Sequence, residues 1–282
     1  MSSSTETTPK IKAVIFDLDG TLLDTESLSC QAVIDSFELT KAPLKPAIRA
    51  KLKQDGNILP WELKRRILGL RGSEWVPITL GYAQEKLEWE GYENGLDWKD
   101  GWQSRTDAKE SEIRERIINT FIETWEMRLG ELCGQVKACP GALELVKALS
   151  EQANIPLAIA TSSRSEGVKK KRQKHEDMFQ HFAHIVTGDD KNVRMGKPAP
   201  DIFIEAARRL GVDPSECIVF EDSLQGAIAG KAAGCITIAV PDKRLDSEAF
   251  KDHSDQVLPS MWHFVGRQYG IDVDMSSNPI GG

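Results

Sequence analysis

Two pairs of acidic side chains follow short apolar runs in this sequence. Asp17 and Asp19 follow the run IKAVIF, and Glu221 and Asp222 follow the run IVF much later in the chain. If folding brings these carboxylates within a few ångströms of one another, they cannot all stay ionised without a cation. Oxygen ligands without cysteine or histidine suit a hard ion, and Mg²⁺ is the natural choice. The four residues are therefore the candidate metal ligands.

Hydroxyl groups and one lysine occupy similar positions elsewhere. Thr161 and Ser162 follow the apolar run IPLAIA, and Lys197 lies within GKPAPDIF. A Mg²⁺ site that keeps several waters usually adds phosphate oxygens from a substrate. The Thr161 hydroxyl, the backbone amides around Ser162 and the Lys197 ammonium would bind that phosphate, and a carboxylate beside it can act as a nucleophile. This chemistry predicts a small phosphorylated metabolite as the ligand.

The apolar runs that carry these residues are typical of buried strands. They span residues 11–17, 155–161, 184–188, 218–222 and 236–240. Helical patterns lie between them, at 141–152, 201–210 and 224–233. Strands that alternate with helices of this length favour a parallel sheet with right-handed crossovers. The predicted fold class is α/β, a doubly wound parallel sheet, which binds ligands at the carboxyl ends of its strands, where the candidate residues stand.

The stretch between the first and second predicted strands has a helical pattern. We predict that residues 26–137 form a helical domain inserted into the sheet domain, with hinges near 22–27 and 133–139 and a loop at 91–106. Its predicted helices are 27–39, 61–70, 78–90 and 108–129. The stretch contains six of the seven tryptophans, which we interpret as packing residues. The sheet domain would take 11–25 and 138–270, between a disordered lead at 1–10 and a disordered tail at 275–282.

Composition limits the possible partners and the compartment. The chain has 282 residues with 36 basic and 43 acidic side chains, and the net charge of −7 argues against a general nucleic-acid binder. No apolar run approaches the ~20 residues that span a bilayer. Five cysteines, an odd number without CxxC spacing, and the lack of a signal-peptide pattern predict a cytoplasmic protein with reduced thiols. The oligomeric state stays open, and a monomer is plausible.

Taken together, four motifs resemble those of the haloacid dehalogenase superfamily of phosphohydrolases. They are DLDGTLLDTE from Asp17 to Glu26, ATSSRS at Thr161, GKPAPDIF at Lys197, and FEDSLQGAIAGKAAG at Glu221 and Asp222. The segments ATSSRS, HIVTGDD and PWELKRRILGLRG are most similar to the subgroup of pseudouridine-5′-phosphatases and sugar-phosphate phosphatases. The resemblance implies a Rossmann-like core, a helical cap at 26–137 and a Mg²⁺-dependent phosphatase.

The resemblance also implies a role for each motif residue. Asp17 would be the nucleophile that forms an aspartyl-phosphate, and Asp19 would be the general acid and then the general base. Asp17, the main-chain carbonyl of Asp19, and Asp222 would hold Mg²⁺, with Glu221 either on the metal or beside it. For the phosphate, Thr161 would bind an oxygen and Lys197 would neutralise charge in the transition state.

Two questions stay open at the level of sequence. Arg71, in the GLRG segment of the predicted cap, either reaches the substrate when the cap closes or is a surface residue on a loop. The core motifs are compatible with a phosphatase that hydrolyses pseudouridine 5′-phosphate or a sugar or polyol phosphate. They are equally compatible with a sugar phosphomutase of the β-phosphoglucomutase type, and a non-catalytic binding protein with the same fold is the third alternative.

Overall fold

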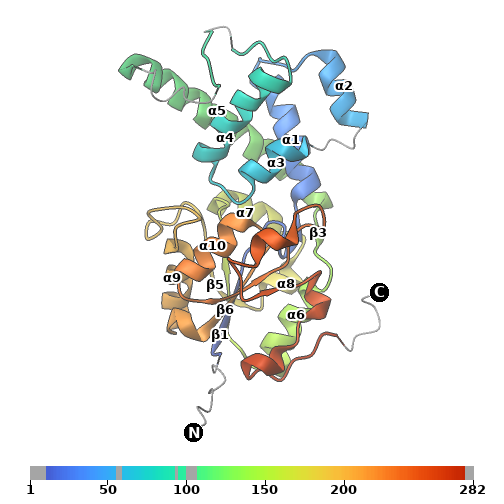
Figure 1. Ribbon diagram of the computed structural model, residues 1–282, viewed down its shortest axis with the longest axis vertical. Coiled ribbons are helices and arrows are strands. Elements are labelled where there is room, and N and C mark those ends of the chain that lie inside the picture. The colour runs from blue at the N-terminus through green and yellow to red at the C-terminus, as the bar shows by residue number, and fades with distance from the viewer. Residues whose placement is uncertain (1–10, 55–58, 93–94, 100–106, 277–282) are drawn as a thin grey trace. The chain divides into compact units, whose positions relative to one another are not determined.

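The computed structural model describes residues 11–54, 59–92, 95–99 and 107–276. The predicted lead at 1–10 lies outside these residues, as do most of the predicted tail and part of the predicted loop at 91–106. The chain divides into two compact units. The α/β unit runs to Asp24, from Lys137 to Val168 and from Lys174 onward, whereas the helical unit comprises Thr25–Val136 together with Lys169–Gln173 (Figure 1).

A six-stranded sheet forms the centre of the α/β unit, in the order β5-β4-β1-β6-β7-β8. Every neighbouring pair is parallel, as predicted. The strands are β1 (Ala13–Phe16), β4 (Leu157–Ala160), β5 (Phe182–Val186), β6 (Cys217–Glu221), β7 (Ile236–Ala239) and β8 (Gln256–Val257). Residues 184–188 were expected as a strand, but β5 begins two residues earlier because Phe182 pairs with Leu157 at a register shift. The short edge strand β8 was not predicted.

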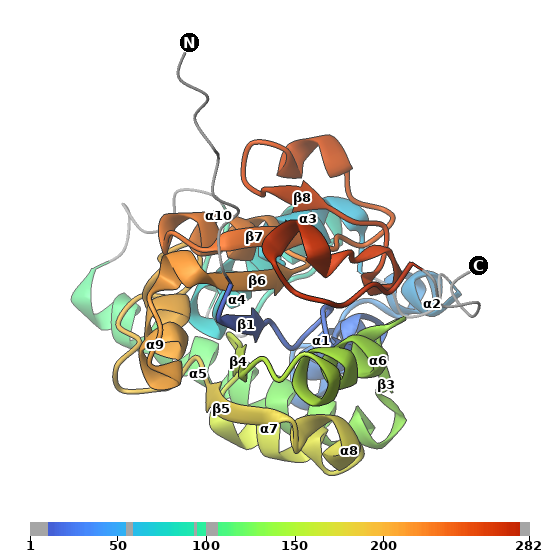
Figure 2. The ribbon, with the colours of Figure 1, turned by 90° about the horizontal axis from the view of Figure 1, so that it is seen from below.

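Helices cover both faces of this sheet. Figure 2 shows α9 on one side of the strands and α6 on the other, and α9 contacts β1, β4 and β5 while α10 contacts β6 and β7. The helices of this unit are α6 (Ala142–Lys147), α8 (Glu176–Phe179), α9 (Asp201–Leu210) and α10 (Leu224–Ala232), while α7 (Ser165–Arg172) is divided between the two units. Because helices cover both faces, strands β1, β4 and β6 are buried along their whole length. Burial on both faces explains why the sequences of these strands are unbroken apolar runs.

The helical unit is built around an aromatic core. Phe37 and Trp75 both pack edge-on against Phe121, with ring centroids 5.3 Å and 6.0 Å apart. Trp89 and Trp98 are also buried, which agrees with a packing role. The helices are α1 (Glu26–Leu39), α2 (Pro46–Gln54), α3 (Trp61–Ile67), α4 (Gly72–Lys86) and α5 (Ala108–Leu132).

Two of these helices differ most from the prediction, whereas α3 ends three residues earlier and α5 three residues later than predicted. The helix expected at 78–90 spans Gly72–Lys86, and at its start the Glu74 side chain accepts a hydrogen bond from the Arg71 N–H. Helix α2 was not predicted, since Leu52 is its one fully buried side chain and its charged composition hides the helical period. No helix among the described residues combines the length and the apolar character that crossing a membrane requires.

A short antiparallel ladder stands at the boundary between the two units along the chain. Strand β2 (Leu23–Asp24) pairs with β3 (Lys137–Ala138), and Cys139 N–H also donates to the Leu22 carbonyl at 2.9 Å. The sequence carries no signal for so short a pair. It lies within the segments where hinges are predicted.

Candidate active site

The loop after β1 begins the site. The Asp17 N–H donates to the Phe220 carbonyl at 2.9 Å, so Asp17 extends the pairing of β1 with β6 by one residue and is 5% exposed. The chain then turns at Gly20, whose φ of +87° favours glycine. A Cβ atom at Gly20 would lie 2.2 Å from Asp222 Oδ2. Glycine therefore lets the β1 loop approach the loop after β6.

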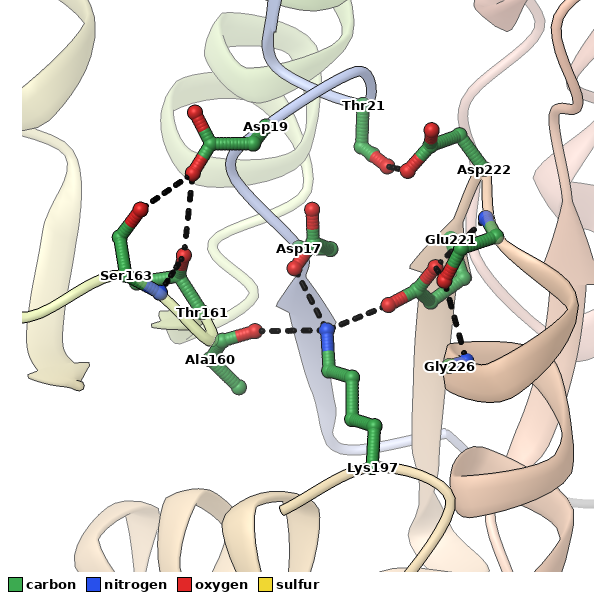
Figure 3. Close-up of polar contacts among 11 residues, drawn as sticks. Asp17, Asp19, Thr21, Ala160, Thr161, Ser163, Lys197, Glu221, Asp222 and Gly226 are labelled. Carbon is green, nitrogen blue, oxygen red and sulfur yellow. Dashed lines mark hydrogen bonds and ion pairs between the residues drawn. The ribbon is translucent and has the colours of Figure 1, made fainter. Parts of the chain in front are cut away.

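Lys197 is at the centre of the site (Figure 3). Its side chain is 1% exposed, and its Nζ donates to Asp17 Oδ1 at 2.5 Å and to Glu221 Oε1. The same Nζ lies 3.4 Å from the Ala160 carbonyl at the end of β4. Burial lowers the pKa of Lys197, but the adjacent carboxylates outweigh burial and raise this pKa above its usual value. Lys197 therefore stays protonated and joins the ends of three central strands.

Glu221 uses both of its carboxylate oxygens within the protein. Oε1 accepts from Lys197, while Oε2 accepts from the Ser223 N–H at 2.9 Å and the Ser223 hydroxyl at 2.8 Å. The Ser223 hydroxyl in turn caps α10 by accepting from the Gly226 N–H at 3.0 Å. A Cβ at Gly226 would overlap Glu221 Oε1. This arrangement favours Glu221 as the partner of Lys197, beside a metal rather than on it.

Asp222 follows Glu221 and turns toward the β1 loop. Its Oδ1 accepts from the Thr21 hydroxyl at 3.1 Å, and its side chain is buried against Gly20. Neither Thr21 nor Gly20 was singled out as a site residue, although both lie inside the DLDGT motif. The close packing of Gly20 and Thr21 on Asp222 holds the acidic residues of β1 and β6 side by side, as the sheet topology predicts.

On the other side of the site, Asp19 faces the loop after β4. Its Oδ2 accepts from the Ser163 hydroxyl at 2.7 Å and lies 3.4 Å from the Thr161 hydroxyl. Thr161 is fully buried, and its N–H donates to Val186 of β5 at 3.0 Å. Ser162 belongs to the same loop, and its carbonyl packs so closely on Gly188 that a Cβ there would lie 2.2 Å away. Ser163 stands beside Thr161 and Ser162 in ATSSRS, but the sequence assigns it no role.

The electrostatics of the site are dominated by excess negative charge. The pKa of Asp17 is raised to about 8: burial is the largest cause, the Lys197 charge opposes it, and the charges of Glu221 and Asp19 add to it. Of the four carboxylates, Asp17 and Glu221 both contact the ammonium group of Lys197. A divalent cation would supply the missing positive charge and favour the ionised form of Asp17.

The donor set fits Mg²⁺ with water and substrate as further ligands. The described residues contain no cluster of three or more histidine, cysteine or acidic side chains that could hold a metal ion alone. Mg²⁺ usually keeps several waters and takes one or two carboxylates plus phosphate oxygens. Asp17 and Asp222, which directly follow the adjacent strands β1 and β6, match that need without a closed protein cage.

Arg71 lies in the helical unit, where its backbone N–H donates to Glu74 Oε2 at 3.0 Å before α4 begins. The other predicted site residues all belong to the α/β unit. Contact between Arg71 and a substrate therefore stays a prediction from the sequence.

Comparison with known proteins adds a family to this geometry. Residues 11–234 match a model of the haloacid dehalogenase-like hydrolases. The chain is 34% identical to a probable pseudouridine-5′-phosphatase of Drosophila melanogaster, covering 93% of this chain and 95% of that protein. It is 32% identical to (DL)-glycerol-3-phosphatase 2 of Arabidopsis thaliana, covering 95% of each. The crystal structure of CbbY from Rhodobacter sphaeroides in complex with phosphate is similar, with a TM-score of 0.65 and 25% identity over 89% of this chain and 95% of CbbY.

Proposed function

We propose that this chain, which belongs to the haloacid dehalogenase-like hydrolase family, is a Mg²⁺-dependent phosphatase of small phosphomonoesters that works through an aspartyl-phosphate. The names of its relatives support pseudouridine 5′-phosphate or a sugar or polyol phosphate, such as glycerol phosphate, as the substrate. The observation that carries the proposal is the buried contact of Lys197 with Asp17 and Glu221, beside Asp222 and Asp19. A cytoplasmic location stays a prediction from the sequence.

The first half of the reaction transfers the phosphoryl group to the protein. An Asp17 carboxylate oxygen attacks phosphorus, and the bond from phosphorus to the leaving oxygen breaks as Asp19 donates a proton to that oxygen. Lys197 neutralises charge on the phosphoryl oxygens, and the Thr161 hydroxyl donates a hydrogen bond to one of them. One well-placed donor of this kind supplies about 3 kcal/mol of barrier reduction.

The second half returns Asp17 to its starting state. Asp19, now a carboxylate, accepts a proton from a water molecule whose oxygen attacks phosphorus. The bond between phosphorus and Asp17 breaks, and inorganic phosphate leaves. Mg²⁺, held by Asp17, Asp222 and the main-chain carbonyl of Asp19, would offset the charge of the phosphoryl group and of the carboxylates.

Release of inorganic phosphate tests the proposal. The substrates are pseudouridine 5′-phosphate, glycerol 3-phosphate, hexose phosphates and nucleoside monophosphates, each measured with Mg²⁺ and with EDTA. We expect Mg²⁺-dependent release from at least one of them, and none from Asp17→Asn. The matched control is Asp252→Asn, an exposed aspartate of the α/β unit outside the four motifs, which we expect to keep wild-type activity. Full activity of Asp17→Asn would contradict the nucleophile, and activity unaffected by EDTA would contradict the metal.

The phosphomutase alternative predicts a different product. With β-glucose 1-phosphate as substrate, a mutase forms glucose 6-phosphate, whereas a phosphatase releases glucose and inorganic phosphate. Measuring both products in one incubation separates the two functions. Conversion mainly to glucose 6-phosphate would replace the phosphatase with the mutase. A protein that turns over no substrate in the presence of Mg²⁺ would favour the non-catalytic alternative.

A further inference from the structure

The carboxylate of Asp19 is held by a residue that the motif roles leave without a function. The Ser163 hydroxyl donates to Asp19 Oδ2 at 2.7 Å, which is a short and well-formed hydrogen bond. The Thr161 hydroxyl lies farther from the same oxygen, at 3.4 Å, and it also accepts from the Ser163 N–H at 3.1 Å. Ser163 therefore makes the shorter of these two contacts with Asp19 Oδ2.

The backbone of Ser163 is itself fixed from two sides. Its N–H donates to Thr161 Oγ1, and its carbonyl accepts from the Gly188 N–H at 2.9 Å. The loop after β5 is joined to the same segment a second time, because the Asp189 carboxylate accepts from the N–H and the hydroxyl of Ser165, both at 2.9 Å. The Ser163 hydroxyl thus stands on a segment tied to two strands, which suits a group that positions another side chain.

The hydrogen bond from Ser163 gives the two carboxylate oxygens of Asp19 different roles. Figure 3 shows Oδ2 turned toward Ser163 and Thr161, and the other carboxylate oxygen turned away from both. An oxygen that accepts hydrogen bonds from hydroxyl groups is a poor place for a proton, because the proton would compete with those donors. The proton that Asp19 exchanges in the reaction therefore belongs on Oδ1.

We infer that Ser163 is a positioning residue for the general acid: its hydroxyl holds Asp19 Oδ2 so that Oδ1 presents the proton to the leaving oxygen. This inference rests on the proposed function. If it is correct, the contribution of Ser163 to the rate depends on how much the leaving group needs the proton from Asp19. A sugar or polyol alkoxide is a strong base and needs protonation as it leaves, whereas p-nitrophenolate leaves as a stable anion.

The test compares two leaving groups in Ser163→Ala. One substrate is p-nitrophenyl phosphate, and the other is the alkyl phosphate that wild-type protein hydrolyses fastest in the substrate screen, both with Mg²⁺. The measured quantity is kcat/KM, which covers only the steps up to the first departure of the leaving group, so that hydrolysis of the aspartyl-phosphate does not contribute. We expect kcat/KM to fall about tenfold for the alkyl phosphate, part of the ~10²–10⁴ of general acid catalysis, and to change little for p-nitrophenyl phosphate.

Three further variants separate positioning from folding. Ser163→Thr keeps the hydroxyl and should keep wild-type values for both substrates, while Ser163→Cys, a weak donor, should fall between wild type and Ser163→Ala. Ser165→Ala removes a hydroxyl two residues away that contacts Asp189 and not Asp19, so any effect should be equal for both substrates. Thermal unfolding of each variant checks that the fold is retained.

Each other outcome overturns the inference. An equal fall in kcat/KM for both substrates in Ser163→Ala would show a merely structural role, and no fall for the alkyl phosphate would show that Ser163 is not needed. Wild-type protein that releases phosphate from neither substrate would contradict the proposed function itself, and the role of Ser163 with it.

Discussion

Replacing Lys197 removes the only cation that the structure places between Asp17 and Glu221 among the described residues. These carboxylates are 5% and 0% exposed, so Lys197→Met would leave two buried acids without their charge partner. Breaking a buried ion pair by removing one partner costs about 3–5 kcal/mol. We expect Lys197→Met to lose that much free energy of unfolding in EDTA at pH 9, above the pKa of about 8 of Asp17, and to lose phosphatase activity.

A second substitution, Glu221→Gln, tests whether the lost stability comes from unpaired buried charge. Glu221→Gln removes one of the two acidic charges, so the double variant Lys197→Met/Glu221→Gln should regain about half of the lost stability while remaining inactive. The expected coupling between the two substitutions is about 1–3 kcal/mol.

The assay is urea unfolding followed by far-ultraviolet circular dichroism. Tryptophan fluorescence would mainly report the helical unit, because Trp262 is the one tryptophan outside residues 26–137. A loss below about 1 kcal/mol in Lys197→Met, the size of an exposed pair, would refute the reasoning. A double variant no more stable than Lys197→Met would also refute it.

Two other substitutions test how the surrounding structure supports the site. Gly20→Ala should abolish most activity, because a Cβ would meet Asp222 Oδ2 at 2.2 Å and the φ of +87° adds about 1–2 kcal/mol of strain; near-normal turnover of this variant would contradict the close approach. Glu205→Gln should cost about 1.5–3 kcal/mol at neutral pH, since the buried Glu205 carboxylate accepts from Arg208 at 2.7 Å and 2.8 Å, from Arg209 at 2.7 Å and from Asn192 at 3.0 Å. The hydrogen bond from Arg208 is the largest influence that lowers the pKa of Glu205. This stabilisation is therefore fully present above the pKa that Glu205 has in the unfolded chain. It is lost as the pH falls through the lower pKa that Glu205 has in the folded protein. Urea unfolding at several pH values should show the gap between wild type and Glu205→Gln narrowing in acid, and a constant or widening gap would count against the network.

The sequence was sufficient to predict a parallel sheet and the polar residues that end its strands. Strands β1 and β6 are buried on both faces, so each is an apolar run that stops at a carboxylate, and parallel pairing brings Asp17 close to Glu221. The lysine of GKPAPDIF follows no predicted strand directly, yet its long side chain reaches both acids. The functional roles of these residues stay proposals.

Features that depend on single contacts could not be predicted. Nothing in the spacing of ATSSRS distinguishes Ser163, whose hydroxyl contacts Asp19, from Ser165, whose hydroxyl contacts Asp189. Helix α2 has too few buried side chains to show a period, and the pairing of β2 with β3 is too short to carry a strand pattern. Whether Glu221 binds the metal directly or lies beside it could not be decided from the sequence either. Only the structure shows that Ser223 donates two hydrogen bonds to Glu221 Oε2.

The central claim, that Asp17 is the nucleophile, can be tested by trapping the intermediate. Wild-type protein is mixed with its best substrate and Mg²⁺, quenched in acid within one turnover, digested with a protease active in acid and examined by mass spectrometry. We predict one phosphoryl group on the peptide that contains Asp17, and none in Asp17→Asn treated in the same way. A phosphoryl group on another residue, or continued turnover by Asp17→Asn, would contradict the account.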